Sequence, residues 1–397
     1  MEIDMARTHG PGFKNTIPSN GQYRARVAAI IEKCYGGVLH HKQNTSIAML
    51  TFAVVCADQL GVAALGKALA LANGTNPKHG TKQVDRFLSN NKMNLRRLFE
   101  PYVRMLIGPA GWIPITIDWT DFDGDNHTTI CVSLLTGSKR GLPLIWLSVD
   151  KANLKDMQKE YERRVLRMLA EILGNRYLDV VVLADRGFGD VDFYSFLEDE
   201  LGFRFIVRYK EGIYTSEDGW LYPSIRLVPK NGRVKVIRDA YVTGAERGPY
   251  TVVLYKAAGM KDAWCLVTNL RDTRGRSIVN LYGRRFECEE GFRDLKDRRY
   301  GYGLSSVRIS DCRRRDRFLI LFALAYVVLT LFGAASEHLG LDRTIRANTE
   351  ESRTHSLFHQ GQALLGRLKR DVFDSLRRAA DGFFRTFLKE GACVAIP

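Results

Sequence analysis

The sequence is poor in cysteine, and its cysteines do not occur in close pairs. Seven cysteines are scattered over 397 residues, and no C-x-x-C motif occurs. A disulfide framework or a zinc knuckle would need paired or closely spaced cysteines. The cysteine content therefore argues against both scaffolds, and it predicts a protein of a reducing compartment such as the cytoplasm.

Long apolar runs are scarce as well. The first residues, Met1–Lys14, are polar and lack the apolar core of a signal peptide. The most apolar run, Phe318–Phe332, is shorter than the roughly 18 residues that suggest a membrane span. We interpret it as a helix buried in a core, and we expect no membrane association. The arginines just before it either contact DNA or mark a helix end at the surface; they are Arg313, Arg314, Arg315 and Arg317.

Negative charge is in deficit. The chain has 59 Lys and Arg against 44 Asp and Glu, a formal net charge of +15. Such a surplus favours a polyanionic partner, because each phosphate neutralised by Lys or Arg releases condensed counterions. Residues 1–110 alone hold 14 Lys and Arg against 6 Asp and Glu. Charge thus favours nucleic acid over a merely basic soluble enzyme.

The residues up to about 108 are predicted to form a helical domain. Apolar side chains recur at helical spacing over 23–35, 45–72, 82–89 and 93–107, and a loop of turn-forming residues covers 73–80. A small, positively charged helical module is typical of DNA-binding regions. The alternative interpretation is a helical cap without a ligand.

From Trp112 onward the pattern predicts a mixed α/β sheet. β-branched and aromatic residues favour strands over 113–119, 128–135, 142–148, 179–184 and 203–209, with helices over 154–173 and 191–201. Asp121–Asn126 has the composition of a hairpin turn. Short alternating runs between about 210 and 270 indicate a β-rich insertion, and helical character returns from Arg276. We expect a catalytic domain over 109–335 and a helical C-terminal region over 336–397.

Two aspartates follow predicted strands. Asp118 ends the first strand, within an apolar run where an unpaired charge is costly, and Asp185 ends the buried strand over 180–184. Carboxylates at the ends of neighbouring strands can converge above a sheet. Each aspartate alone is a weak signal, because such residues often cap turns, and Asp121 is a rival to Asp118.

The segment 282–296 carries a more specific pattern. Tyr282, Arg285, Glu289 and Lys296 follow one another at i, i+3, i+7 and i+14. On one continuous helix they fall within roughly 60° of each other. A carboxylate beside Arg, Lys and a phenol suits a phosphodiester, since the carboxylate can hold a metal ion while the cations bind phosphate oxygens. The alternative is a solvated face of ion pairs, and Gly291 weakens helical continuity.

This pattern resembles a known family. Tyr282, Arg285, Glu289 and Lys296 match the Tyr-x2-Arg-x3-Glu-x6-Lys signature of the insertion-sequence-four family of DDE transposases. The strand that ends in Asp118 and the ADRGFG turn at Asp185 resemble that family's two aspartate motifs, in the same order. The resemblance covers about residues 80 to 335.

The resemblance implies an RNase H-like fold in which Asp118, Asp185 and Glu289 hold two Mg²⁺ ions, with Mn²⁺ as a substitute. It implies that the element's terminal inverted repeats are cut, usually through hairpins, and that the freed 3′ ends are joined to target DNA. Tyr282, Arg285 and Lys296 would contact DNA phosphates. A homodimer would hold two ends together, helped by the C-terminal region.

Hairpins need a flipped base, which must stack on an aromatic ring. Trp264 resembles the family's stacking tryptophan, although a tryptophan in the core of the insertion is the alternative. Two further groups of residues are not assigned a metal site. Asp121, Asp123 and Asp125 lack the spacing of a calcium loop. His355 and His359 have no third ligand nearby in the sequence.

Two other functions remain open. The chain could be an RNase H-like nuclease without strand transfer, which the absence of joined target products would reveal. It could also be a domesticated DNA-binding protein without catalysis. Retention of all three carboxylates and of the whole signature argues against the latter.

Overall fold

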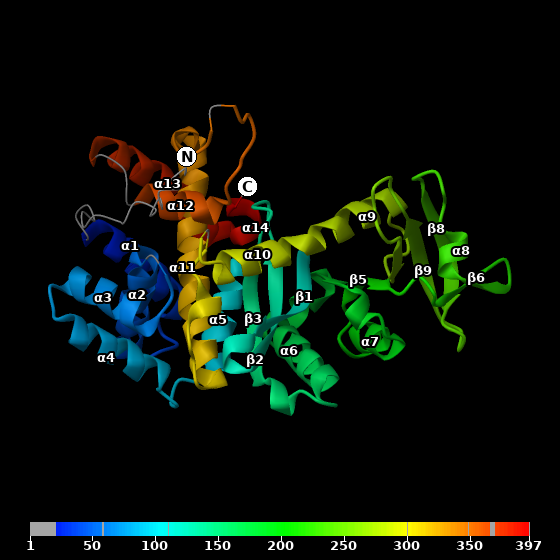
Figure 1. Cartoon of the computed structure of the whole chain (residues 1–397), viewed down its shortest axis with the longest axis horizontal. Coiled ribbons are helices and arrows are strands. Elements are labelled where there is room, and N and C mark those ends of the chain that lie inside the picture. The colour runs from blue at the N-terminus through cyan, green and yellow to red at the C-terminus, as the bar shows by residue number, and fades with distance from the viewer. Residues whose placement is uncertain are drawn as a thin grey trace, which may run out of the picture.

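The computed structural model describes residues 21–57, 59–109, 111–299, 301–347, 349–365 and 370–396. The polar segment Met1–Lys14 lies outside these residues. The molecule is elongated, with helices at one end, a sheet in the middle and a β-rich extension at the other end (Figure 1).

The first part of the described chain is helical, as expected. Its helices are α1 (Gly21–Tyr35), α2 (His41–Cys56), α3 (Val62–Asn73), α4 (Pro77–Leu88) and α5 (Leu95–Ile107). Side chains of Asn76 and Asn94 cap the first turns of α4 and α5 by accepting backbone N–H groups. The helical pattern expected over 45–72 is interrupted, because Ala57 adopts an extended conformation after α2 and Gly61 precedes α3.

A mixed sheet forms the middle of the molecule. Its strands are β1 (Ile113–Phe122), β2 (His127–Leu135), β3 (Gly141–Asp150), β4 (Val180–Ala184) and β5 (Arg204–Tyr209). They lie in the order β3-β2-β1-β4-β5, with β1, β4 and β5 parallel and the first three antiparallel. Each strand expected from the sequence is confirmed within a few residues. The result is the expected α/β, RNase H-like catalytic fold.

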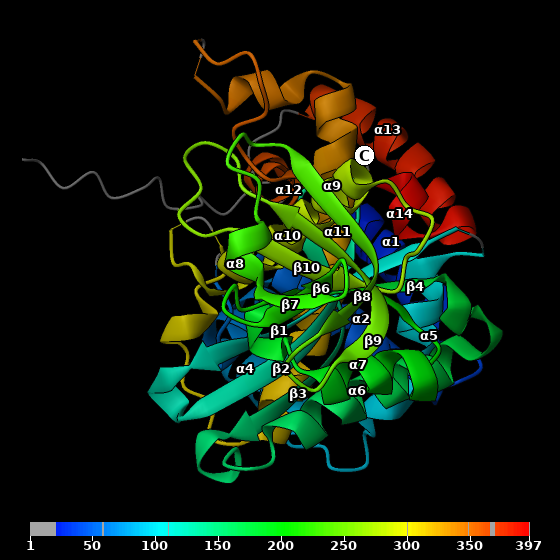
Figure 2. The same cartoon turned by 90° about the vertical axis from the view of Figure 1, so that its right-hand side faces the viewer.

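The β-rich insertion continues this sheet. It consists of β6 (Tyr214–Glu217), β7 (Trp220–Pro223), the short helix α8 (Ser224–Leu227), β8 (Val234–Val242), β9 (Arg247–Tyr255) and β10 (Trp264–Thr268). Strand β10 pairs with β5, so ten strands form one sheet that ends at β7. Figure 2 looks at the molecule from this end.

Helices cover both faces of the sheet. On one face, α9 (Gly275–Gly283) and α10 (Glu287–Lys296) cross the strands, and α9 packs on alternate residues of β4 such as Val181 and Leu183. The remaining residues of β4 face the opposite way, toward the core that includes α6 (Gln158–Leu173) and the neighbouring α7 (Val191–Ser195). Gly291 lets α10 lie against β3, because a Cβ there would be 2.6 Å from the Gly141 carbonyl oxygen.

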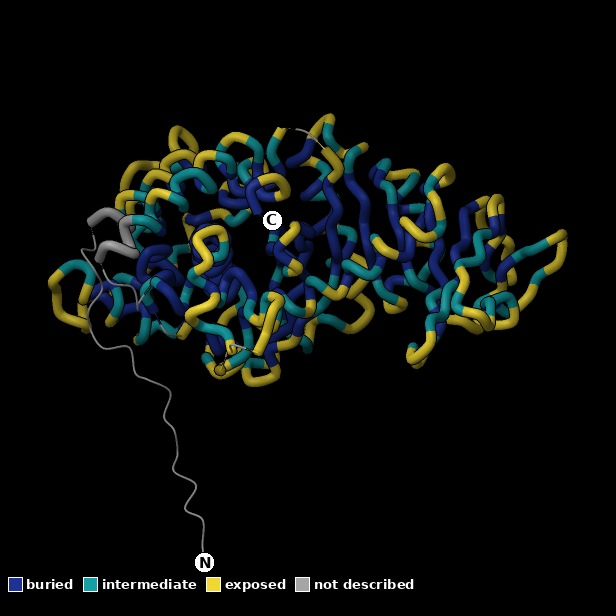
Figure 3. Tube along the Cα trace, turned by 90° about the horizontal axis from the view of Figure 1, so that it is seen from above, coloured by how far each residue is buried: buried dark blue, intermediate teal, exposed yellow. Residues whose placement is uncertain are grey.

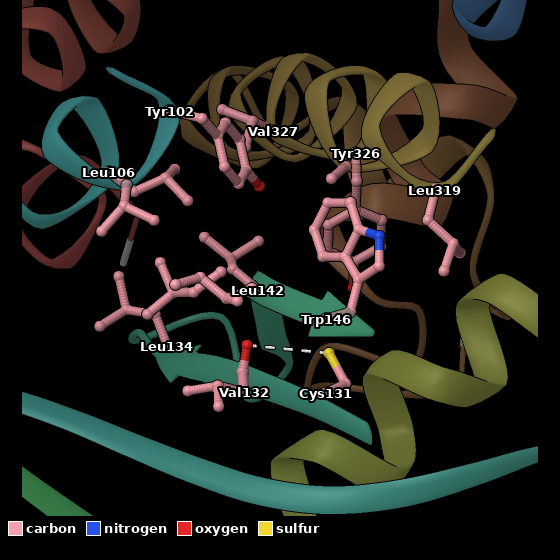
Figure 4. Close-up of a cluster of buried hydrophobic side chains, with 14 of the residues drawn as sticks. Tyr102, Leu106, Cys131, Val132, Leu134, Leu142, Trp146, Leu319, Tyr326 and Val327 are labelled. Atoms are coloured by element: carbon pink, nitrogen blue, oxygen red, sulfur yellow. Dashed lines mark hydrogen bonds between the residues drawn. The ribbon is translucent and has the colours of Figure 1, made fainter. Parts of the chain in front are cut away.

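The core extends from the sheet into the helical end. Figure 3 shows the buried chain running through the centre of the molecule. The apolar run at 318–332 lies within α11 (Cys312–His338), and the most apolar part of α11 is wholly buried in the protein. By length and composition α11 would also qualify as a membrane span. Its burial confirms the predicted core helix, and Figure 4 shows Leu319, Tyr326 and Val327 packed against Tyr102 and Trp146.

The C-terminal helices pack around α11 as well. They are α12 (Leu357–Leu365), α13 (Arg370–Glu390) and α14 (Ala392–Ala395). Gly361 and Gly333 allow backbone contact between α12 and α11, since a Cβ at Gly361 would lie 2.0 Å from the Leu329 carbonyl oxygen. An ion pair between Arg26 and Asp381 joins α13 to α1. Helices from both ends of the chain thus contact each other beside the sheet.

The arginine cluster before the apolar run is only partly at the surface. Arg313 is exposed, whereas Arg315 and Arg317 are buried. Arg317 donates to the Leu88 carbonyl oxygen and to Asn91, so it anchors the end of α4. The interpretation of the whole cluster as a surface helix end or DNA contact is therefore wrong for Arg315 and Arg317.

The neighbouring Asp316 predicts a pH dependence of stability. Burial raises the pKa of Asp316 to about 7, although the Ser148 N–H donates to this carboxyl at 2.9 Å. Since the unfolded chain loses this proton near its usual pKa of 3.8, the free energy of unfolding should fall as pH rises from about 4 to about 7. Asp316→Asn keeps an acceptor for Ser148 and removes the charge.

We expect Asp316→Asn to be more stable than wild type at about pH 8 and to lose this advantage below about pH 4. Urea unfolding at several pH values measures the difference. A variant that is less stable than wild type across the whole range would show that the folded protein needs the charged form.

Candidate active site

The sheet brings Asp118 and Asp185 to neighbouring positions. β1 and β4 run parallel, and their last paired residues are Thr116 and Leu183. Asp118 and Asp185 come two residues later on each chain segment and therefore share one face of the sheet. This is the face that α9 and α10 cross. The expected convergence of these two aspartates is therefore present.

Asp185 stands at a tight turn. Its side chain caps the 3-10 turn Arg186–Phe188 by accepting the Gly187 N–H at 2.8 Å. A Cβ at Gly187 would lie 3.0 Å from the Asp185 carboxylate, so the glycine leaves room for this contact. The turn fixes Asp185 at the end of β4.

The signature segment is not one continuous helix. α9 ends at Gly283, a 3-10 turn covers Arg284–Phe286, and α10 begins at Glu287. The expectation of a single helix over 282–296 is therefore wrong at this turn. Gly291, which raised doubt about continuity, lies inside α10, where it serves the close approach to β3.

Arg285 joins two of the three predicted ligands. Its Nη1 lies 3.4 Å from Asp118 Oδ2, and its Nη2 lies 2.5 Å from Glu289 Oε1. The Arg285 side chain is 7% exposed, compared with 21% for Asp118 and 50% for Glu289. A buried guanidinium thus counters the charges of a β1 carboxylate and an α10 carboxylate at the same place.

The charges at this site affect one another. Burial raises the pKa of Asp118, Arg285 lowers it, and the negative charge of Asp185 raises it again. Burial also raises the pKa of Tyr282 to about 12, with Arg285 lowering it and Asp185 raising it. Asp118, Asp185, Arg285 and Tyr282 therefore form one electrostatic cluster, in which the Arg285 cation offsets the charge of the carboxylates.

The donor set fits a divalent metal ion in kind. Three carboxylates supply the hard oxygen ligands that Mg²⁺ and Mn²⁺ prefer. Among the described residues, however, no group of three or more His, Cys, Asp or Glu side chains lies close enough to hold an ion. The Arg285 guanidinium takes the cationic place between Asp118 and Glu289.

Lys296 lies apart from the other three signature residues. It comes seven residues after Glu289, which corresponds to about 10 Å along a helix. Its ammonium lies 5.0 Å from the centre of the Phe122 ring, at the end of the β1–β2 hairpin. Burial lowers the pKa of Lys296, whereas Asp121 and Asp123 raise it. Lys296 therefore marks the far end of α10.

Trp264 lies beside the site. Its ring centre is 5.0 Å from that of Tyr282 and 6.2 Å from that of Phe286, and the Phe286 ring is stacked on it. Trp264 is half-buried, while Phe286 is 42% exposed. Arg285 lies next to these aromatic rings, and its guanidinium is 4.6 Å from the centre of the Phe286 ring.

Cys288, which the sequence pattern did not indicate, is also part of this site. Its thiol lies 3.6 Å from Asp118 Oδ2, and burial raises the pKa of the thiol so that it stays protonated and donates to the carboxylate. The available signal was its place directly before Glu289. The pattern did not indicate Phe286, directly after Arg285, either.

The remaining candidates lie outside the cluster. Asp121, the rival first ligand, pairs with Lys151 at 3.1 Å. His355 and His359 stack on each other with ring centres 5.0 Å apart, and within the described part of the chain no third metal ligand joins them.

Comparison with known proteins identifies the domain. The family model of the transposase DDE domain matches residues 119–328. This range is more than half of the chain, begins directly after Asp118, and contains Asp185 and Glu289. Among curated proteins, none matches the chain. The chain therefore belongs to the family of transposase DDE domains, whose members are nucleases that act on DNA with divalent metal ions.

Proposed function

We propose that the protein is a cut-and-paste transposase similar to the insertion-sequence-four family, with Asp118, Asp185 and Glu289 as its metal ligands. The observation that carries this proposal is the shared guanidinium of Arg285. It counters Asp118 and Glu289 together, next to Asp185, at the one face where β1, β4 and α10 meet. Carboxylates gathered around a cation are the arrangement from which a metal site can form.

We assign two Mg²⁺ ions to this site, with Mn²⁺ as a substitute, because all three ligands are hard oxygen donors. When bound, such ions activate a water molecule or a 3′-hydroxyl and stabilise the leaving oxygen. Occupancy by all three ligands requires that Arg285 leave its place between Asp118 and Glu289.

Once displaced, Arg285 contacts the DNA substrate. The Nε–H of Arg285 is buried without a hydrogen-bond partner among the described residues, so a donor is available for a phosphate oxygen. Tyr282 positions Arg285, and Lys296 supplies a second cation at the other end of α10. Trp264 offers a ring on which a flipped base stacks if the ends are opened through hairpins.

We assign binding of the DNA ends to the helical regions before and after the catalytic domain. Residues 1–108 bind the terminal inverted repeats. The charge of residues 1–110 supports this assignment, because they contain 14 Lys and Arg against 6 Asp and Glu. Residues 336–397 contribute to a homodimer that holds two ends, and the freed 3′ ends attack target DNA at the nucleoid.

A cleavage assay tests the chemistry. Duplexes that carry the borders of the gene's own element are incubated with Mg²⁺ or Mn²⁺ and with wild type, Glu289→Gln or Glu290→Gln. Glu290 is next to Glu289 on α10, but its carboxylate pairs with Arg140 on the sheet side and with Arg293 at the surface. We expect cuts at the borders with wild type and Glu290→Gln, and none with Glu289→Gln.

The products discriminate among the alternatives. Joined target products support strand transfer, whereas cuts without joining support a nuclease. Binding of the borders without cutting by any of the three proteins supports a domesticated DNA-binding protein. Equal cutting by Glu289→Gln and wild type contradicts the assignment of the ligands.

A further inference from the structure

Helices α3 and α4 form a compact two-helix unit. Three residues, 74–76, join them, and Gly74 adopts the left-handed conformation with φ of 62°. Asn76 then caps α4 by accepting the Lys78 N–H at 2.9 Å, and Pro77 occupies the first helical position. Two helices joined by a turn of three or four residues with a glycine are typical of the helix-turn-helix motif.

The two helices touch through their backbones. A Cβ at Gly80 would lie 2.1 Å from the Gly66 carbonyl oxygen, and a Cβ at Gly66 would lie 2.4 Å from Thr81 Oγ1. Because Gly66 and Gly80 carry no side chains, α3 and α4 lie in close contact at this crossing. The unit therefore presents one face of α4 outward in a defined orientation.

That outward face is basic and has no partner in the protein. Lys78, Lys82 and Arg86 are exposed and lie within about 80° of one another around the helix. Their side chains make no ion pair or hydrogen bond with any described residue. Asp85, the only acidic residue of α4, is held at 2.8 Å by Arg314 of α11. The face as a whole is therefore positive.

The unit is attached firmly to the catalytic domain. Besides holding Asp85, Arg314 donates to Ser89, and Arg317 donates to the Leu88 carbonyl oxygen at the end of α4. Both arginines belong to α11, which also packs against β3 of the catalytic sheet. Figure 1 shows α4 at the outer side of the helical end.

We propose that α3 and α4 are a helix-turn-helix unit and that α4 is the recognition helix, lying in the major groove of the element's end. Lys78, Lys82 and Arg86 contact phosphates on one side of the groove. His79 and Gln83, next to this basic stripe, contact base edges, as the second helix of such units does near its N-terminus. The inference rests on the proposed function, which supplies the DNA end as the ligand.

Selection of binding sites from a random pool of DNA duplexes tests this assignment with the full-length protein and without metal ions. Wild type should enrich one sequence motif. His79→Ala/Gln83→Ala should lose preference for that motif over a shuffled duplex by about tenfold or more, while retaining non-specific binding. Circular dichroism confirms that the variants are folded.

A charge-removal series tests the phosphate contacts. Lys78→Ala/Lys82→Ala/Arg86→Ala should weaken binding to both duplexes and reduce the slope of log affinity against log salt by up to about 2.7, or about 0.9 for each contact. The matched control is Arg226→Ala/Lys230→Ala/Arg233→Ala, which removes the same charge from exposed positions of the β-rich insertion. This variant should still enrich the wild-type motif.

The proposal is wrong if wild type enriches no motif, or if His79→Ala/Gln83→Ala enriches the wild-type motif. Failure of the proposed function is distinguishable from either result, because cleavage depends on Glu289 and metal ions, which this selection does not use. A chain that selects a motif through α4 but never cuts would be a DNA-binding protein with this recognition helix.

Discussion

Asp118→Asn is expected to lower the rate of DNA end cleavage by on the order of a thousandfold or more. A bound metal ion contributes several kcal/mol of charge stabilisation in the transition state, and each 1.4 kcal/mol corresponds to about tenfold in rate. Asparagine keeps the size of the side chain and one oxygen, but it removes the negative charge that faces Arg285 at 3.4 Å. The loss therefore reports on charge and not on packing.

Asp121→Asn is the control for this substitution, because Asp121 is the alternative first ligand on the same strand. The structure places Asp121 beside Lys151 and leaves it outside the cluster around Arg285. We expect its variant to cleave at close to the wild-type rate. Cleavage that depends on Asp121 and tolerates Asp118→Asn would shift the metal site toward the β1–β2 turn.

Mn²⁺ binding without DNA separates ligand loss from other defects. Calorimetric titration should show weaker Mn²⁺ binding by Asp118→Asn than by wild type or Asp121→Asn. Thermal unfolding of all three proteins checks the fold. Undiminished Mn²⁺ binding by Asp118→Asn would mean that Asp118 acts on the substrate and not on the metal ion.

Local sequence was sufficient to predict the catalytic sheet. The strands at 113–119 and 179–184 consist of β-branched and apolar residues bounded by turn formers, and both recur in the structure as β1 and β4. Asp118 lies within β1, which continues to Phe122, and Asp185 directly follows β4, so the parallel pairing of the two strands brings these aspartates together. Strand propensity therefore predicted the two strands, whereas their parallel pairing is a property of the tertiary fold.

Contacts between distant segments were not predictable in this way. The helical spacing of the signature gives no indication of the 3-10 turn at Arg284–Phe286, where Arg284 donates to the Thr136 carbonyl oxygen. Gly291 was interpreted through helix propensity, but its role is to approach Gly141 of β3. The position of Arg285 between Asp118 and Glu289 also depends on the tertiary fold.

The same limit applies to the arginines that precede the apolar helix. Charge at a helix end usually faces water, so sequence favoured the surface for Arg315. In the fold its side chain is fully buried, and the guanidinium lies 3.9 Å from the centre of the Phe122 ring. It pairs with Asp125 of the β1–β2 turn and donates to His127 Nδ1 at 3.2 Å.

Arg315→Met is therefore expected to destabilise the protein by about 3–5 kcal/mol, because it removes the buried cation beside Asp125 and leaves this carboxylate with the exposed Arg308 at 3.8 Å and the Ile309 N–H at 2.9 Å. The Asp125 side chain is 9% exposed, and water cannot replace the guanidinium fully. Urea unfolding measures the change. Arg313→Met is the matched control, since Arg313 lies exposed on the same helix, and its change should stay within about 0.5 kcal/mol.

The double variant Arg315→Met/Asp125→Asn shows whether the loss comes from the pair. Removing both charges leaves no buried charge uncompensated, so the double variant should be less destabilised than the two single variants added together. This non-additivity would identify the pair as the joint that holds the β1–β2 turn against α11. α11 also holds α4, the proposed recognition helix, through Arg314 and Arg317. Simple addition of the two single effects would instead mean that Arg315 stabilises α11 through Phe122 and His127, independently of Asp125.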